Sequence, residues 1–191
     1  MAKTRTFVAI ESGPDLQRRA EGVADRLRPY APRARWVDPD DLHLTLLFLG
    51  DLDDREVAEA CSAADWVAKA NEPFSLRVHG VGAFPAPSRP RAIWLGVSDG
   101  RDAVCRLQAD LDDAIGHLVQ KRERRGYVPH WTLARMARGG PVPRLDAVLP
   151  SLAEHDAGVQ AVDEIVVLAS ELHPEGPDYY ALARCPLGAG G

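Results

Sequence analysis

The stretch HLTL at residues 43–46 returns as HWTL at residues 130–133. In each copy a histidine precedes a threonine by two positions, with apolar residues between and after them. Successive side chains of a β-strand point to opposite faces, so the histidine and the threonine of each copy would share one face. The doubled pattern therefore predicts two strands that each present an imidazole and a hydroxyl.

The first copy lies in a strand that we predict over residues 42–49. Leu44 and Leu46 fall on one face of this strand, whereas His43 and Thr45 fall on the other. Polar groups on one face of an otherwise apolar strand are costly unless that face lines a cleft. We therefore expect the two motifs to contribute to one shared site.

The rest of the pattern predicts an α+β protein. Further strands are predicted over residues 4–10, 74–84, 92–97, from 129 to a break at 139–141, and over 162–169 and 179–183; helices are predicted over 14–27, from 53 or 54 to about 70, and over 101–119 and 143–152. Gly50-Asp51 is expected to end the first motif strand. Each motif strand is preceded by a helix and followed by a break and another helix. This shared order predicts a pseudo-two-fold arrangement with the motif strands meeting at its centre.

Length and composition favour one compact unit or two lobes, since 46% of the 191 residues are hydrophobic. No run of 18 apolar residues appears, and the N-terminus has no signal-peptide pattern, so we expect a soluble, cytoplasmic protein with no membrane partner. The three cysteines, Cys61, Cys105 and Cys185, show no CxxC spacing and are expected to be buried or half-buried small residues.

Charge argues against a protein that coats long nucleic acids. The net charge is −5, and such binding depends largely on neutralising phosphates. Positive charge is nevertheless clustered at Arg33 and Arg35, at Arg89 and Arg91, and in the run at residues 121–125. The last cluster precedes the second motif closely and is compatible with a small anionic group held locally.

Two histidines and two threonines suit acid/base chemistry on a phosphodiester. The nucleophile approaches phosphorus on one side while the leaving oxygen departs on the other, so a base and an acid must flank the phosphate. An imidazole pKa near 6.5 lets one histidine be neutral while its partner is cationic. Thr45 and Thr132 would then donate hydrogen bonds to the non-bridging oxygens.

Other chemistries lack their motifs. There is no HExxH, and Asp38, Asp40 and Asp41 near the first motif have no recognisable metal-ligand spacing, so we expect no metal. Neither a Walker A sequence nor a GxGxxG fingerprint is present. His79, His117, His155 and His173 have no threonine partner and are expected to be structural or on the surface.

On these motifs the chain resembles the 2H phosphoesterase superfamily, and specifically the bacterial RNA 2′,3′-cyclic phosphodiesterases, also called 2′-5′ RNA ligases. The resemblance rests on the two motifs and on residues 6–10, 42–51, 82–85, 90–91, 94–97 and 129–135. It implies a bilobal α+β fold in which two antiparallel sheets line a central cleft with helices outside. It also implies catalysis without metal, ATP or another cofactor.

The resemblance implies roles for individual residues. His43 would be the proton donor to the departing 3′ oxygen, and His130 the proton acceptor that activates water, which leaves a 2′-phosphate. With a 5′-hydroxyl RNA end in place of water, related chemistry would form a 2′-5′ linkage reversibly.

Two further residues match the family pattern. Phe48 would stack on a terminal base, although a core strand position is the alternative. Arg135 would hold phosphate, but strand alternation puts it on the face opposite His130 and Thr132, so this role requires the strand to end or bulge. Trp131, where the family commonly has a small aliphatic residue, is expected to pack away from the site.

We expect residues 1–187 to form a single bilobal catalytic domain and residues 188–191 a flexible glycine-rich tail. The expected substrates are RNA ends that bear a 2′,3′-cyclic phosphate, and the protein is expected to be a monomer without an obligate protein partner. One alternative is a phosphodiesterase for small nucleotide or ADP-ribose cyclic phosphates. Another is a non-catalytic module that binds RNA ends, although binding alone would not require both histidines and both threonines.

Overall fold

Nine strands form one hydrogen-bonded sheet in the computed structural model, which describes residues 3–121, 126–136, 145–173 and 176–188. The strands are β1 (Thr4–Glu11), β2 (Ala34–Trp36), β3 (His43–Leu52), β4 (Phe74–Phe84), β5 (Ala92–Val97), β6 (Trp131–Met136), β7 (Asp156–Val162), β8 (Glu164–Leu172) and β9 (Pro177–Pro186). The helices are α1 (Pro14–Leu27), α2 (Asp54–Ala70), α3 (Arg101–Ile115) and α4 (Leu145–Val148), with short 3₁₀ turns η1 (Arg28–Tyr30), η2 (Pro39–Asp41), η3 (Gly116–Leu118) and η4 (Leu149–Leu152).

The strand order is β7-β4-β5-β6-β3-β1-β8-β9, with β2 paired to β6 beside this path. All the pairings are antiparallel. The two sheets expected from the sequence are therefore joined, and the junction is the pair Leu44 and Trp131 between β3 and β6. The two motif strands lie next to each other at the centre of the molecule.

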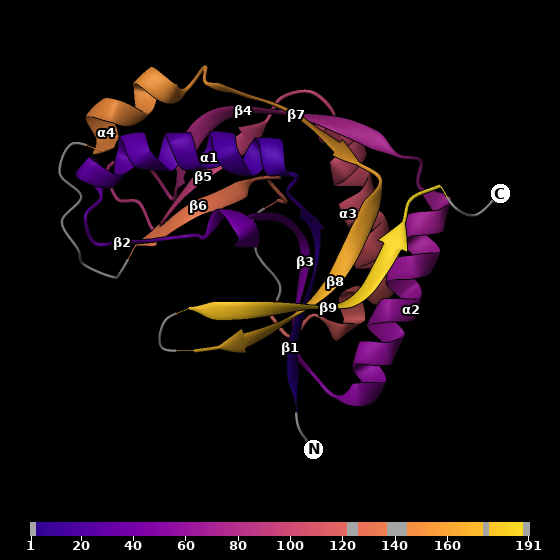
Figure 1. Ribbon diagram of the computed structural model, residues 1–191. Coiled ribbons are helices and arrows are strands. Elements are labelled where there is room, and N and C mark those ends of the chain that lie inside the picture. The colour runs from indigo at the N-terminus through magenta and orange to yellow at the C-terminus, as the bar shows by residue number, and fades with distance from the viewer. Residues whose placement is uncertain (1–2, 122–125, 137–144, 174–175, 189–191) are drawn as a thin grey trace.

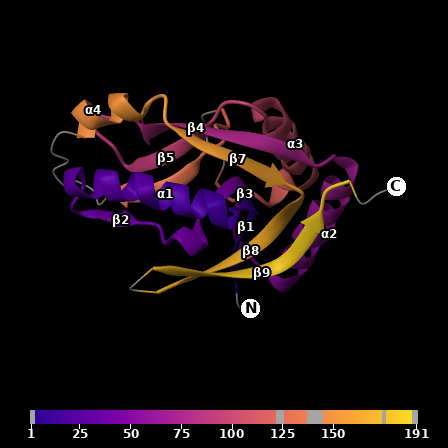
Figure 2. The same cartoon turned by 45° about the horizontal axis from the view of Figure 1, so that its top comes forward.

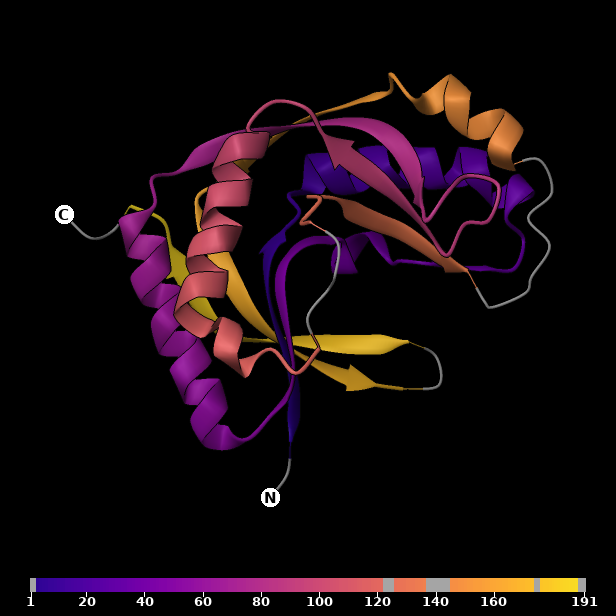
Figure 3. The ribbon, with the colours of Figure 1, turned by 180° about the vertical axis from the view of Figure 1, so that it is seen from behind.

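The helices divide between two lobes (Figure 1). The first lobe consists of β3, β1, β8 and β9, against which α2 packs, with α3 beside α2 and against β3. The second lobe consists of β2, β6, β5, β4 and β7, with α1 packed against β6 and β7 and η4 against β4. Figure 2 shows α1 running across the second lobe, and Figure 3 shows α2 and α3 side by side along the outside of the first.

The pseudo-two-fold arrangement expected from the sequence is confirmed by the topology. The series β1-α1-β3-α2 corresponds to β5-α3-β6-α4. Outward from β3 the sheet continues with β1, β8 and β9, and outward from β6 it continues with the corresponding strands β5, β4 and β7. The lobes also interlock, because α1 follows a strand of the first lobe but packs on the second, and α3 does the reverse. The motif strands are the innermost pair of this arrangement.

Local sequence signals account for the helix limits. Pro14 occupies the first turn of α1, where its missing N–H costs nothing. Asp53 caps α2 by accepting from the backbone N–H groups of Arg55 and Glu56, while the Glu56 side chain accepts from the backbone N–H of Asp53. Both starts agree with the sequence prediction. The third helix ends earlier than predicted, at Ile115, and continues as the 3₁₀ turn η3.

Three sequence expectations about strands were wrong. Gly50 does not end the first motif strand: with a φ of 101° it forms part of a bulge, and β3 continues to Leu52. The strand predicted over residues 162–169 is the end of β7 and most of β8, divided at Asp163. The short β2 and the body of β7 were not predicted, since β2 has three residues and β7 contains Asp156 and Gly158, which have low β-propensity.

Some expectations fall outside the described residues. These are the basic run beyond Lys121, the break at residues 139–141, the start of the helix predicted over 143–152, and residues 189–191 of the tail. The rest of that helix is present as α4 and η4. Cys61 and Cys105 are half-buried and Cys185 is buried, and all three are free thiols, as expected.

One apolar core extends through both lobes. Its largest fully buried side chains include Leu44 and Trp131 at the junction, Leu49 and Leu52 of β3, and Leu107 and Leu111 of α3. A second, smaller cluster of Phe7, Ala9, Val166 and Leu168 lies on the opposite face of the first lobe. Both faces of the central strands are therefore supported by packed side chains.

None of the described helices is long and apolar enough to cross a membrane.

Trp94 of β5 depends on a glycine of the neighbouring strand. Gly82 pairs with Trp94, and a Cβ at position 82 would overlap the indole ring. We predict that Gly82→Ala lowers the free energy of unfolding by about 1–3 kcal/mol, the usual cost of overpacking. Urea denaturation measures this change.

Gly22 offers the matched control. It lies in α1, and a Cβ there would meet nothing within 4 Å. Gly22→Ala should therefore be neutral or stabilise the protein by about 0.5–1 kcal/mol, because alanine favours helix. Equal stability of the two variants would contradict the proposed role of Gly82.

Candidate functional site

The two motifs meet on one face of the sheet. Leu44 and Trp131 form an antiparallel pair, and the same register continued by one residue sets His43 opposite Thr132 and Thr45 opposite His130. Paired side chains of adjacent strands point to the same face, with Cβ atoms about 4.5–5.5 Å apart. The structure thus gathers both histidines and both threonines on the face opposite Leu44. A cleft enclosing them remains a prediction.

A β-bulge follows the threonine in each motif. In the pairing of β1 with β3, Ala9 faces Thr45 and Val8 faces Leu47, so Leu46 is the extra residue. The pairing of β5 with β6 contains the same irregularity, which makes Leu133 the extra residue. The fourth residue of each HxTL motif is therefore the bulged one. Both leucines are buried, so the bulge keeps an apolar side chain in the core while it reverses the alternation that follows.

The reversal brings Phe48 and Arg135 to the histidine face. Phe48 pairs with Phe7 of β1, whose ring centroid lies 5.1 Å from that of His43. Arg135 pairs with Ala92, which shares its face with Trp94 beside His130. Strict alternation would have put both residues on the opposite face. The bulge that the phosphate role of Arg135 requires is present, although the role itself stays a prediction.

Phe48 is exposed over 39% of its surface, which excludes the alternative of a core strand residue. Its ring stacks on Phe7 with 6.4 Å between centroids, and the guanidinium of Arg5 lies 4.7 Å above it. Trp131 is fully buried in the core, as its alternation predicts. Phe48 and Arg135 occupy equivalent positions, three residues after the threonine of each motif.

The same backbone contact orients both imidazoles. Nδ1 of His43 lies 2.7 Å from the carbonyl oxygen of Asp41, and Nδ1 of His130 lies 2.7 Å from that of Val128. A carbonyl oxygen only accepts hydrogen bonds, so each Nδ1 carries a proton. Each Nε2 is consequently the nitrogen that exchanges a proton with a substrate.

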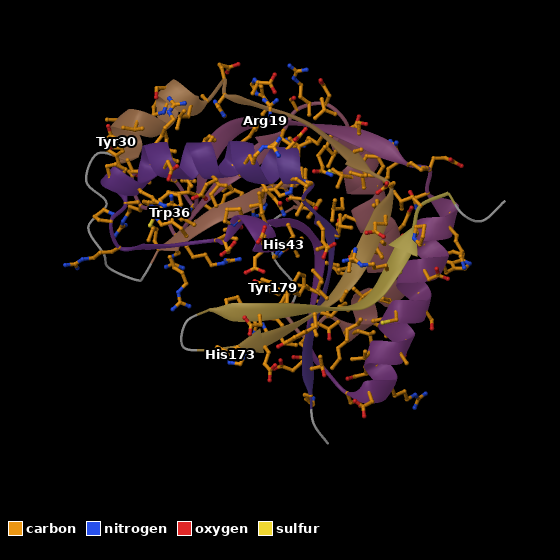
Figure 4. The ribbon with its side chains drawn as sticks, in the orientation of Figure 1. Arg19, Tyr30, Trp36, His43, His173 and Tyr179 are labelled. Atoms are coloured by element: carbon orange, nitrogen blue, oxygen red, sulfur yellow. The ribbon has the colours of Figure 1, made fainter. Side chains whose placement is uncertain are left out.

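Aromatic rings hold each imidazole edge to face. Tyr179 of β9 contacts His43 with 5.2 Å between centroids and an interplanar angle of 78°, and Figure 4 shows the two side chains close together between β3 and the β8–β9 hairpin. Phe84 contacts His130 in the same manner, at 5.0 Å and 87°. Trp94 adds a second ring beside His130. These rings restrict rotation of the imidazoles and exclude water from their sides.

Burial lowers the pKa of both His43 and His130 from the ordinary value, and the hydrogen bond to a backbone carbonyl opposes this change. The positive charge of Arg135 lowers both pKa values further. Below pH 6.5 the unfolded chain therefore binds more protons at these two histidines than the folded protein does. The two neutral imidazoles thus contribute to the free energy of unfolding above that pH, and this contribution is lost as the pH falls.

Tyr127 connects the two motif segments directly. Its hydroxyl donates to the carbonyl oxygen of Thr45 at 3.0 Å, and burial raises its pKa, so it remains a neutral donor. Gln120 also docks on β3, because its backbone N–H donates to the carbonyl oxygen of Leu49. The segment that leads to the second motif is thus fastened to the strand of the first.

Sequence reasoning missed the residues that support the imidazoles. Phe7, Tyr179, Phe84 and Trp94 were visible only as apolar strand residues, and their contacts depend on strand order. The alternation of β1 puts Phe7 on the face of Glu11, but only the sheet shows that His43 lies opposite Glu11.

The other histidines have different surroundings. His117 lies 2.7 Å from Glu59 and His173 lies 3.4 Å from Asp178, both on the surface. Among the described residues, no group of three or more His, Cys, Asp or Glu side chains is arranged to hold a metal ion.

Known proteins are similar in sequence to this chain over nearly its whole length. The RNA 2′,3′-cyclic phosphodiesterase of Methanothermobacter thermautotrophicus is 30% identical over 93% of this chain and 95% of its own. That of Thermotoga maritima is 30% identical over 97% of both chains. The family model described as LigT-like phosphoesterase matches residues 10–94, which include the first motif. The chain belongs to the LigT-like phosphoesterase family.

Solved structures agree with this membership. The protein TT0787 of Thermus thermophilus superimposes with a TM-score of 0.80 at 26% identity, covering 96% of this chain and 98% of its own. LigT of Escherichia coli, at 22% identity, shares the fold with a TM-score of 0.76, covering 98% of this chain and 99% of its own. The resemblance to 2H phosphoesterases read from the two motifs is thereby confirmed, and so is the α+β fold class.

Arg135 provides a direct test of the site's electrostatics in this LigT-like chain. We predict that Arg135→Gln raises the pKa of both His43 and His130, because it removes a positive charge that acts on both. The pH dependence of the two imidazole Cε1–H signals in NMR spectra measures this.

Arg91→Gln is the control, since Arg91 also lies on the surface near β6 but exerts no resolved effect on either histidine. A rise in only one of the two pKa values in Arg135→Gln would show that Arg135 does not face both histidines.

Proposed function

We propose that this protein hydrolyses 2′,3′-cyclic phosphate ends of RNA to 2′-phosphomonoesters, with His130 as the base and His43 as the acid. The observation that carries the proposal is the junction of the two motif strands, which sets two equally oriented imidazoles and two threonine hydroxyls on one face. The names of the relatives support the same reaction class.

The reaction balances with one water molecule. Nε2 of neutral His130 accepts a proton from water as its oxygen bonds to phosphorus. The bond between phosphorus and the 3′ oxygen breaks, and this oxygen takes the proton from Nε2 of cationic His43. The product has a 2′-phosphate and a 3′-hydroxyl, and the two histidines return to their starting states by exchanging protons with solvent.

The protonated Nδ1 atoms suit both roles. Because each Nδ1–H is bound to a backbone carbonyl, neutral His130 presents a lone pair at Nε2, and cationic His43 presents an N–H there. Lowered pKa values favour the neutral form, which His130 needs as a base. His43 needs a nearby negative charge to be cationic, and the substrate phosphate supplies one.

The remaining groups would bind the phosphate and the nucleoside. Thr45 and Thr132 would donate to the non-bridging oxygens from opposite strands, and Arg135 would neutralise their charge. Phe48, which contacts Phe7 and Arg5 and is 39% exposed, would receive the terminal base on its exposed surface. No step in this scheme uses a metal or a cofactor.

With a 5′-hydroxyl end in place of water, the same groups would form a 2′-5′ linkage. The enzyme would act in the cytoplasm, and it would act there as a monomer, as the family resemblance implies.

The decisive assay uses an oligonucleotide that ends in a 2′,3′-cyclic phosphate, incubated with the protein in the presence of a chelator. We expect a 2′-phosphate product, identified against authentic 2′- and 3′-phosphate standards. His43→Ala and His130→Ala should each reduce kcat/KM by about 100-fold or more, the usual contribution of a general acid or base.

His117→Ala is the matched control, because this surface histidine contacts Glu59 rather than either motif. It should retain full activity. Full turnover by either motif variant, or a 3′-phosphate product, would contradict the proposed roles. A requirement for metal would contradict the metal-free mechanism. Turnover of a cyclic mononucleotide but not of the oligonucleotide would favour a small-nucleotide substrate.

A further inference from the structure

The two histidines are nearly equivalent, yet the proposed reaction assigns them opposite roles. Both follow a backbone carbonyl acceptor by two residues, both pack edge to face against an aromatic ring, and both feel Arg135. Neither motif therefore contains the reason why one imidazole should give a proton and the other take it. One difference in charge beside the two histidines lies on the strands next to the motif strands.

One carboxylate breaks the symmetry. Glu11 of β1 pairs with His43 of β3, so the two side chains emerge on the same face. The equivalent strand beside β6 is β5, where Leu95 pairs with Trp131. The same register continued by one residue sets Gly96 opposite His130. Glu11 and Gly96 thus occupy equivalent positions.

Position 96 has no room for a side chain. A Cβ on Gly96 would lie 2.9 Å from the carbonyl oxygen of His79 and 3.0 Å from the ring of Trp94. A carboxylate at position 96 is therefore excluded by packing, whereas Glu11 at the equivalent position beside His43 is exposed and accommodated.

Arg184 of β9 holds Glu11 in place. Its guanidinium donates to Glu11 at 2.8 Å and to Glu164 at 2.6 Å. Both carboxylates are partly exposed, so this network positions Glu11 without cancelling its charge completely. The negative charge of Glu11 raises the pKa of His43, against burial and Arg135, and has no resolved effect on His130.

Other groups around His43 do not provide this difference. Arg135 of β6 faces both histidines and opposes protonation of each. Tyr179 of β9 is a neutral ring whose pKa is raised by burial. Asp41 lies before β3 and binds His43 through its carbonyl oxygen, and burial with neighbouring Asp38 and Asp178 raises the pKa of its carboxyl group.

We propose that Glu11, positioned by Arg184, is the residue that makes His43 rather than His130 the proton donor. This inference rests on the proposed function for the direction of proton transfer. Glu11 is a positioning residue: it acts through His43 by stabilising the imidazolium before the 3′ oxygen departs.

The test follows the two imidazoles separately. NMR pH titration of the Cε1–H signals is expected to show that Glu11→Gln lowers the pKa of His43 and leaves that of His130 unchanged. Arg184→Gln, which releases the charge of Glu11, is expected to raise the pKa of His43. Glu164→Gln is the matched control, because it removes the other carboxylate bound to Arg184 and should leave both histidines unchanged.

Kinetics provide the second readout. In Glu11→Gln, kcat/KM should fall roughly twofold to fivefold, the effect expected of one partly exposed charge, and the alkaline limb of the pH profile should move to lower pH. An equal shift of both histidines in Glu11→Gln, or no shift of either, would overturn the proposal. So would a shift of His43 in Glu164→Gln as large as that in Glu11→Gln. The titration needs no substrate, so its result is independent of whether the proposed hydrolysis occurs.

Discussion

The candidate site depends on the antiparallel contact between β3 and β6. In the described part of the chain these strands pair through Leu44 and Trp131, and both side chains are fully buried in the core that the two lobes share. Separating the lobes would expose both side chains, at a cost of about 1.5–3 kcal/mol for each large apolar residue. Trp131 adds area at this junction although its indole N–H is buried without a partner. The apolar face therefore fixes the distance between the imidazoles on the polar face.

The bulges explain how a short motif controls a wider set of residues. A regular strand after Thr45 would present Leu47 to the histidine face and bury Phe48, but the extra residue Leu46 exchanges their places. The equivalent irregularity at Leu133 brings out Arg135 and buries Ala134. The final leucine of HxTL thus has a structural function: it fills the core while the strand reverses its alternation.

Sequence reasoning could predict what depends on short-range patterns. The faces of the residues around His43, the starts of α1 and α2 and the paired order of strands and helices all follow from periodicity and local chemistry. Bulges follow from the register between strands, so the strand alternation at Phe48 and Arg135 was misleading without the sheet. The wrong prediction that the strand ends at Gly50 has the same cause, because only the pairing of Gly50 with Thr6 distinguishes a bulge from a strand end. The neighbours of each histidine were out of reach because Phe7, Tyr179, Phe84 and Trp94 come from four strands.

A pseudo-two-fold site supplies two similar histidines easily, but a hydrolase of the proposed kind needs them to differ. The residues around the two motifs differ at two pairs of equivalent positions. Three residues after each threonine, Phe48 places a ring on the first strand where Arg135 places a cation on the second. Across from each histidine, Glu11 offers a charge where Gly96 offers only backbone. All four residues lie outside the tetrapeptides, so the motif can stay symmetrical while its surroundings set the direction of the reaction.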